Sequence, residues 1–162
     1  APEKALDKLN RLSDFHLHSI EQPIRQGQWE RMAALCETTP LPIALDEELI
    51  GIYPITEKEK LLKAVKPQFI ILKPSLLGGF SASEEWISLA EKQGAGWWVT
   101  SALESNIGLN AIAQWTFTLG NQMPQGLGTG QIYTNNIDSP LFIRKGKLYH
   151  DPDKEWNTTK IY

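Results

Sequence analysis

Short apolar runs rich in β-branched or aromatic residues alternate along this chain with longer amphipathic stretches. The pattern predicts strands over residues 15–20, 42–45, 69–72 and 97–100. Helices are predicted over 2–12, from 29 to a point before Pro40, from 56 through 65, from 81 to near Gly94, and over 106–118. Strands that alternate with helices are typical of βα units on a parallel sheet, so we predict the α/β class.

Two of these helices are preceded by the pattern of a capping box. Thr56 with Glu59, and Ser81 with Glu84, have the spacing in which the two side chains satisfy each other's backbone amides. After Pro140 the pattern changes to a predicted β-hairpin over about 140–150, followed by a polar tail at 151–162. We find no internal boundary, so residues 1–162 are interpreted as a single domain, with the βα units spanning about 1–130.

Composition excludes several classes of partner. The net charge of −3 comes from intermingled acidic and basic residues, without the basic cluster that binds nucleic acid. No apolar run approaches the ~18 residues that a membrane-spanning helix needs. Cys36 is the single cysteine, so no intrachain disulfide forms, and its place on the apolar face of a helix predicts a packing role. With no leader-like segment at the N-terminus, we expect a cytoplasmic protein.

Charged residues recur where the predicted strands end. Glu21, Asp46 and Lys73 follow three successive strands, and Ser101 with Glu104 follows the next one. The carboxyl ends of parallel strands meet at one rim in β/α folds, and the active site lies there. We therefore expect these side chains to gather at one rim, although helix capping and surface ion pairing would also explain charges at such positions.

Two carboxylates at adjacent strand ends fit a hard divalent cation such as Mg²⁺, which prefers oxygen ligands. A lysine on the next strand could then transfer a proton or stabilise an anion. This combination suits proton abstraction beside a substrate carboxylate.

Other candidate sites have weaker support. His16 and His18 lie two apart on a predicted strand, but no third ligand has the spacing of a zinc site, so buried or hydrogen-bonded histidines are expected. The glycine-rich segment at 125–130 lacks the Lys-Ser/Thr pair of a phosphate-binding P-loop. A turn that grips the backbone, or one that binds a ligand carboxylate, is equally compatible with it.

Four segments carry a family resemblance: Ser19-Ile-Glu-Gln-Pro, Ala44-Leu-Asp-Glu-Glu, Ile71-Leu-Lys-Pro-Ser and Thr100-Ser-Ala-Leu-Glu-Ser-Asn-Ile-Gly. In order and spacing they resemble successive barrel-strand motifs of the enolase superfamily, most of all its o-succinylbenzoate synthase branch. The resemblance runs over about residues 1–149. It implies the C-terminal half of an enolase-type (β/α) TIM-like barrel, with a C-terminal hairpin.

The resemblance also assigns roles to individual residues. Glu21 and Asp46 match the second and third of the family's three Mg²⁺ carboxylates, and Mn²⁺ is an alternative ion. Lys73 matches the catalytic lysine of the sixth strand, which stabilises an enediolate anion during the dehydration of a cyclohexadiene carboxylate in menaquinone biosynthesis. The substrate-binding positions that it implies are Thr100, Ser101, Glu104, Gly128 and Thr129.

The family's Lys-x-Lys motif, its first metal-ligand Asp and its N-terminal capping domain have no match here. We therefore expect this chain alone to bind Mg²⁺ weakly and not to turn over, while the full-length protein would be a carbon–oxygen lyase acting on a small carboxylate. Half a barrel exposes an unpaired strand edge, so self-association or assembly with the missing N-terminal half is expected.

Two groups of alternatives stay open at this point. One contains other superfamily enzymes: N-acylamino acid racemase, dipeptide epimerase and muconate cycloisomerase, which share the lysine and the carboxylates. The other is a non-catalytic half-barrel that only assembles.

Overall fold

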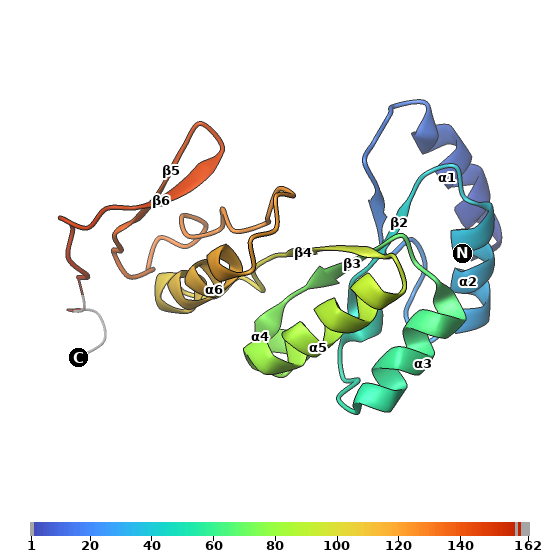
Figure 1. Cartoon of the computed structure of the whole chain (residues 1–162). Coiled ribbons are helices and arrows are strands. Elements are labelled where there is room, and N and C mark those ends of the chain that lie inside the picture. The colour runs from blue at the N-terminus through green and yellow to red at the C-terminus, as the bar shows by residue number, and fades with distance from the viewer. Residues whose placement is uncertain (1, 158, 160–162) are drawn as a thin grey trace. The chain divides into compact units, whose positions relative to one another are not determined.

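The computed structural model describes residues 2–157 and 159. The chain forms two compact units (Figure 1). The first comprises Ala1–Leu72 and Leu76–Trp97, and the second comprises Lys73–Ser75 and Trp98–Tyr162.

A parallel sheet organises the first unit, whose boundary falls inside the last strand, after Trp97. Its strands are β1 (Ile20–Glu21), β2 (Ile43–Leu45), β3 (Phe69–Leu72) and β4 (Gly96–Val99), in the order β1-β2-β3-β4 (Figure 1). The β1–β2 and β2–β3 pairs are parallel, as the alternation of strands and helices predicts. Gly96, at the start of β4, donates its N–H to the carbonyl of Gln68 at 2.9 Å.

Helices connect these strands and pack on one another in chain order. They are η1 (Pro2–Lys4), α1 (Ala5–Ser13), α2 (Trp29–Thr38), η2 (Glu47–Leu49), α3 (Ile55–Val65), α4 (Pro74–Leu77) and α5 (Gly79–Lys92). Figure 1 shows α1, α2, α3 and α5 as successive neighbours. Their apolar faces bury Leu9, Met32, Leu35, Leu61, Leu62, Val65, Trp86 and Ala90.

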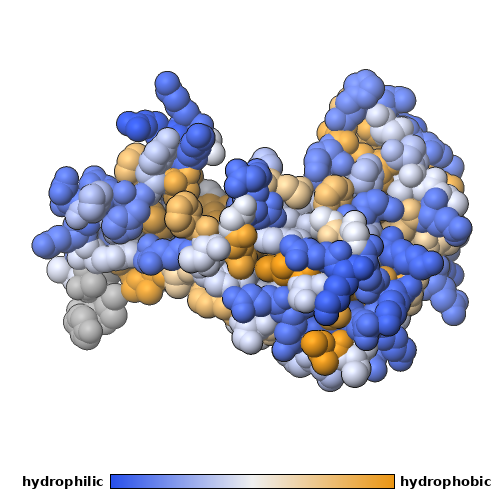
Figure 2. All heavy atoms as spheres, in the orientation of Figure 1, coloured by the Kyte–Doolittle hydropathy of each residue, from blue (hydrophilic) through white to orange (hydrophobic). Residues whose placement is uncertain are grey.

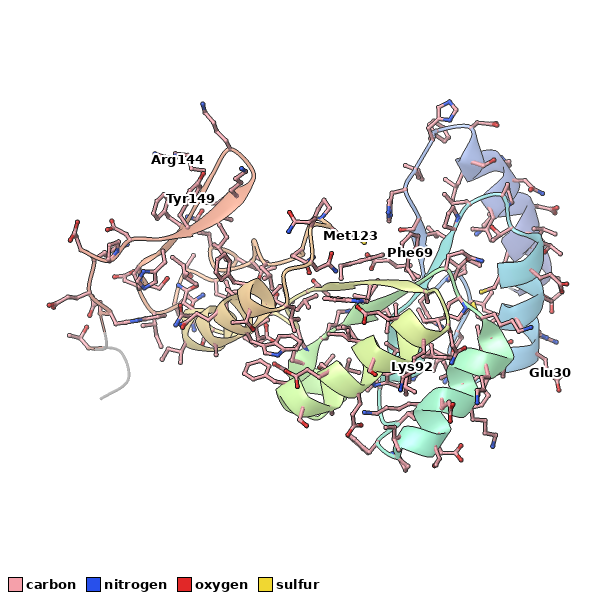
Figure 3. All side chains as sticks on the ribbon, in the orientation of Figure 1. Glu30, Phe69, Lys92, Met123, Arg144 and Tyr149 are labelled. Carbon is pink, nitrogen blue, oxygen red and sulfur yellow. The ribbon has the colours of Figure 1, made fainter. Side chains whose placement is uncertain are left out.

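The second unit contains α6 (Asn106–Thr118) and the antiparallel hairpin of β5 (Leu141–Arg144) and β6 (Lys147–His150). Both turn residues, Lys145 and Gly146, have positive φ angles of 50° and 72°, as a tight two-residue hairpin turn requires. The Arg144 guanidinium lies over the Tyr149 ring at 5.1 Å, and both side chains project from the hairpin in Figure 3. The predicted hairpin is therefore confirmed.

The strand predicted over 15–20 is wrong except at its end. Only Ile20 and Glu21 form a strand, while Phe15 is 72% exposed and His16 has a φ of 53°. Pairing begins where the Ile20 N–H bonds to the carbonyl of Pro42. Pro42 has no N–H to continue the ladder, so the apolar–polar alternation before Ile20 has no partner to pair with.

Neither predicted capping box forms. Helix α3 begins at Ile55, after Pro54, and α5 begins at Gly79, after Gly78 with its φ of 95°; neither helix has a side-chain cap hydrogen bond. Both helices therefore begin upstream of the predicted capping residues, so Thr56 and Ser81 lie inside the first turns and not ahead of them.

Surface properties follow from this arrangement. On the face shown in Figure 2, hydrophilic residues cover much of the helices, with apolar residues in smaller patches between them. Within residues 2–157 and 159, no helix has both the length and the apolar character to cross a membrane.

An ion pair between a buried lysine and a partly exposed glutamate joins α3 to α5. The Lys58 side chain is fully buried and donates to the Glu85 carboxylate at 2.7 Å and to the Ala82 carbonyl at 3.0 Å. Its ammonium also lies 5.5 Å from the centroid of the Trp86 ring. These contacts satisfy a charge that would otherwise be costly to bury.

We expect Glu85→Ala to lower the free energy of unfolding by about 1–3 kcal/mol, because it leaves a buried ammonium short of one partner. Lys58→Met should cost less, since it removes the buried charge and keeps the side-chain length. The control is Glu59→Ala: Lys63 contacts Glu59 at the same 2.7 Å, but in solvent. Urea unfolding of the three variants checks the order, and an equal loss from Glu85→Ala and Glu59→Ala would contradict it.

Cys36 packs on the inner face of α2, as the sequence predicts. Burial raises the pKa of its thiol from 9.0 to about 12. The folded state therefore holds the proton at pH values where the unfolded chain has lost it. The contribution of this thiol to the free energy of unfolding is fully present below pH 9 and is lost as the pH rises from about 9 to about 12.

A thiol probe such as DTNB at pH 8 should label native Cys36 at least about 100-fold more slowly than the urea-unfolded chain, because only the thiolate reacts. The stopped-flow labelling rate measures this difference. Similar rates in the two states would show that the thiol is accessible and ionised in the fold.

Candidate functional site

The carboxyl ends of β1 and β2 carry the two candidate metal ligands. Glu21 is the last residue of β1 and pairs in register with Ala44 of β2. Side chains alternate along a strand, so Ala44 and Asp46 point to one face, the face that Glu21 shares. The structure therefore brings Glu21 and Asp46 to one face of one sheet end.

These two side chains differ in exposure. Asp46 is 5% exposed, whereas Glu21 is exposed and its carboxylate makes no hydrogen bond or ion pair with residues 2–157 and 159. Carboxylate oxygens in such a place fit the ligand preference of Mg²⁺, which commonly takes one or two carboxylates and fills its octahedron with water or substrate oxygens. Within the described part of the chain, no group of three or more His, Cys, Asp or Glu side chains could hold a metal ion. The chain thus offers two ligands that suit the ion.

Lys73 follows β3 directly and is half-buried. It opens the short segment Lys73–Ser75 that belongs to the second unit. Its position after the strand is the one that the sequence predicts.

Hydroxyl groups meet where β4 ends in the second unit. Thr100 forms an isolated parallel bridge with Gly126, and the Ser101 N–H donates to the Gly126 carbonyl at 3.1 Å. One residue later, the hydroxyls of Ser101 and Thr129 lie 2.6 Å apart. The glycine-rich segment therefore runs beside the end of β4, where Gly126 forms a parallel bridge with Thr100.

Gly126 is required for that approach, because a Cβ at this position would overlap the Thr100 side chain. Gly128, in contrast, is exposed and lies near the side chain of Ile143. Of the predicted substrate-binding positions, the structure brings Ser101 and Thr129 into direct contact.

Glu104 is occupied by its own loop. Both of its carboxylate oxygens accept the Ala102 N–H, at 3.0 and 2.9 Å, and one also accepts the Ser75 hydroxyl at 2.5 Å. A Cβ at Gly108 would lie 2.9 Å from the Glu104 Cβ, so the glycine gives this side chain its room. These contacts tie the loop after β4 to the segment that carries Lys73, within the second unit.

The histidine expectation is partly wrong. His16 and His18 are both exposed and lie outside the strand, so they are not buried. His18 does hydrogen-bond with Ser19 at 3.0 Å, and its ring lies 4.7 Å from that of Phe69.

Sequence reasoning missed Gln22, whose side chain binds the backbone after β2, and Glu48, which accepts hydrogen bonds from the Gln22 amide and the Gly27 N–H. Glu48 is only 4% exposed. Its burial is visible only in the fold, because Asp46 to Glu48 reads in the sequence as a polar turn.

Two curated proteins are similar to this chain in sequence. The chain is 61% identical over 148 residues to an o-succinylbenzoate synthase of Desulfotalea psychrophila, covering 91% of this chain and 40% of that protein. It is 34% identical over 106 residues to an N-succinylamino acid racemase of Thermus thermophilus, covering 64% of this chain and 27% of that protein. The chain thus spans less than half the length of these curated relatives.

Solved structures give the same fold. The crystal structure of MenC from Desulfotalea psychrophila superposes with a TM-score of 0.88 at 61% identity, covering 91% of this chain and 41% of that one. The muconate lactonizing enzyme of Pseudomonas putida superposes with a TM-score of 0.82 at 26% identity, covering 94% of this chain and 42% of that one. These likenesses confirm the predicted enolase-type α/β fold.

The family described as Enolase C-terminal domain-like matches residues 1–154, which include every candidate residue named above. On this match, the chain belongs to the enolase C-terminal domain-like family.

Proposed function

We propose that the full-length gene product containing this chain is an o-succinylbenzoate synthase, a lyase that dehydrates a cyclohexadiene carboxylate. The observation that carries the proposal is the 61% identity over 91% of the chain to the Desulfotalea psychrophila protein of that name. Because the chain spans 40% of that relative, the activity is assigned to the whole protein. These residues alone are expected to bind the cation weakly and not to turn over.

Glu21 and Asp46 are assigned as two oxygen ligands of Mg²⁺, for which Mn²⁺ is the laboratory substitute. Their support is the register that puts both on one face of the sheet end, and the hard-oxygen chemistry of the pair. When bound, the ion supplies positive charge that makes the proton beside a substrate carboxylate easier to remove.

Lys73 is assigned as the residue that stabilises the negative charge left on the substrate when that proton departs. An ammonium directly after β3 suits this role, because charge stabilisation by preorganised groups gives enzymes much of their rate. The dehydration breaks one C–H and one C–O bond, releases water and forms a C=C bond.

The hydroxyls of Ser101 and Thr129 are assigned to the substrate's succinyl group, together with Thr100 and the open backbone at Gly128. Support comes from the short contact between the two hydroxyls, which can reorient to donate to a carboxylate. Glu104 is assigned the role of shaping this loop, since its oxygens are taken up by Ala102 and Ser75.

A second candidate is racemisation of N-succinylamino acids, favoured by the 34% identity to the Thermus thermophilus racemase. Both reactions begin by removing a proton beside a carboxylate, so the same residues would serve either. A substrate screen of the full-length protein separates them: racemisation without dehydration would overturn the leading assignment.

Lys73→Ala should lower kcat for the dehydration by about 100- to 1000-fold, the usual cost of removing one group that stabilises developing charge. Lys66→Ala is the matched control, because Lys66 lies before β3 whereas Lys73 lies directly after it. The activity of the Lys66→Ala variant should stay at the wild-type level. The appearance of the aromatic product is followed by absorbance. Equal activity of Lys73→Ala and Lys66→Ala would refute the role of Lys73.

Glu21→Gln and Asp46→Asn should each weaken Mn²⁺ binding by at least about tenfold, because each loses a charged oxygen ligand. Glu37→Gln, which removes an exposed carboxylate on α2, should bind as the wild type does. Free Mn²⁺ is measured by electron paramagnetic resonance during titration of the full-length protein. Unchanged binding in Glu21→Gln and Asp46→Asn would place the metal elsewhere.

A further inference from the structure

The side-chain amide of Gln22 lies between the ends of β1 and β2 and bonds in both directions. Its carbonyl oxygen accepts the N–H groups of Asp46 and Glu48, at 3.2 and 3.4 Å. Its NH₂ group donates to the Ile24 carbonyl at 3.0 Å and to the Glu48 carboxylate at 2.9 Å. One side chain therefore ties the residue after Glu21 to the backbone that carries Asp46.

Glu48 fixes which way this amide points. Its carboxylate is buried and only accepts hydrogen bonds, from the Gln22 NH₂ group at 2.9 Å and from the Gly27 N–H at 2.8 Å. The NH₂ end of Gln22 must therefore face Glu48, and its oxygen must face the two backbone N–H groups. A leucine or methionine at this place would leave these buried groups without partners.

The backbone of Gln22 is held as firmly as its side chain. Its N–H donates to the Ala44 carbonyl at 2.9 Å, and its φ is 36°, in a region that side chains other than glycine seldom adopt. Such a conformation persists only where the surroundings impose it, and in folded proteins it gathers at functional sites. Here it marks the point where the chain leaves β1, one residue after Glu21.

Asp46 is anchored on both sides of its α-carbon. Its N–H is held by Gln22, and its carbonyl accepts the Leu49 N–H at 3.1 Å at the start of η2. With both flanking peptides fixed, the direction of its Cα–Cβ bond is fixed too. Gln22 is joined to Glu21 by a peptide bond and to the Asp46 N–H by its side-chain oxygen, so it links the backbone positions that carry the two carboxylates.

We infer that Gln22 is a positioning residue that sets the spacing of the Glu21–Asp46 pair for a divalent cation, with Glu48 as the group that orients its amide. The inference rests on the proposed role of those two carboxylates. Hydrogen-bonding partners that orient metal ligands commonly contribute 10- to 100-fold to metal affinity, and Gln22 is expected to do so through the backbone.

Gln68 provides a matched control within the same sheet. Its amide also bridges backbone groups, accepting the Ile43 N–H at 2.9 Å and donating to the Cys36 carbonyl at 2.9 Å. These contacts lie at the start of β2, whereas those of Gln22 lie at its end. A substitution at Gln68 therefore removes similar hydrogen bonds to the backbone, at the end of β2 away from Glu21 and Asp46.

The test titrates Mn²⁺ into the full-length gene product and its Gln22→Met, Gln68→Met and Glu21→Gln variants, with free Mn²⁺ read by electron paramagnetic resonance. Urea unfolding in a chelator measures the stability of each metal-free protein. Both methionine variants should lower the urea midpoint, but only Gln22→Met should weaken Mn²⁺ binding, by about 10- to 100-fold. If Gln22→Met does not fold, Gln22→Asn replaces it, since its amide is one methylene too short to reach both strands.

A swap variant, Gln22→Glu with Glu48→Gln, keeps the net charge and the bonds to Asp46, residue 48 and Gly27, and loses only the donation to the Ile24 carbonyl. It should bind Mn²⁺ more tightly than Gln22→Met. Equal losses from Gln22→Met and Gln68→Met, or wild-type binding by Gln22→Met, would overturn the positioning role while leaving the metal site intact. Unchanged binding in Glu21→Gln would instead refute the proposed metal site, and the inference with it.

Discussion

The parallel register of β1, β2 and β3 is the constraint on which the first unit depends. Ile20 pairs with Ile43, and Ala44 pairs with both Glu21 and Phe69, so the three strands are aligned residue by residue. A slip of one residue would turn Glu21 to the opposite face from Asp46. Because β1 and β2 run parallel, Glu21 and Asp46 follow their strands at the same end of the sheet.

Side-chain amides supply hydrogen bonds at the ends of the short strands. The strand β1 has two residues and β2 has three, so few ladder bonds hold them. Gln68 closes one end of β2 and Gln22 closes the other. In the second unit, Gln125 likewise accepts the Val99 N–H at 2.7 Å, near the end of β4. Each amide satisfies backbone groups that an irregular segment would otherwise leave unpaired.

The sequence was most informative where local pattern and tertiary environment agree. The strand at 69–72 and the helix at 106–118 have the predicted bounds. Phe69–Leu72 is a short apolar run, which favours a buried strand, and the helix buries Leu109, Ile112 and Thr116 at helical spacing. The apolar–polar alternation from Phe15 to Ile20 predicts a strand that does not form. A strand needs a partner, and Pro42 ends the hydrogen-bond ladder at Ile20. The capping pairs failed because Pro54 and Gly78 start their helices upstream.

The candidate site was predictable only in part. Placing Glu21, Asp46 and Lys73 after successive strands needed no more than the order of the elements. Gln22 and Glu48 were not predictable, because their role depends on hydrogen bonds between segments 26 residues apart in the chain. The burial of Lys58 was not predictable for a similar reason. In the sequence it is one of several lysines on a charged helix, and its burial comes from the packing of α3 on α5.

We propose that Glu21 and Asp46 hold one divalent cation. Anomalous diffraction from crystals of the full-length gene product soaked in Mn²⁺ tests it most directly. We expect one strong peak within about 2.3 Å of a carboxylate oxygen of each residue, as hard-cation coordination requires. A peak bound by other side chains, with Glu21 and Asp46 outside its coordination shell, would show that these two carboxylates do not form the metal site.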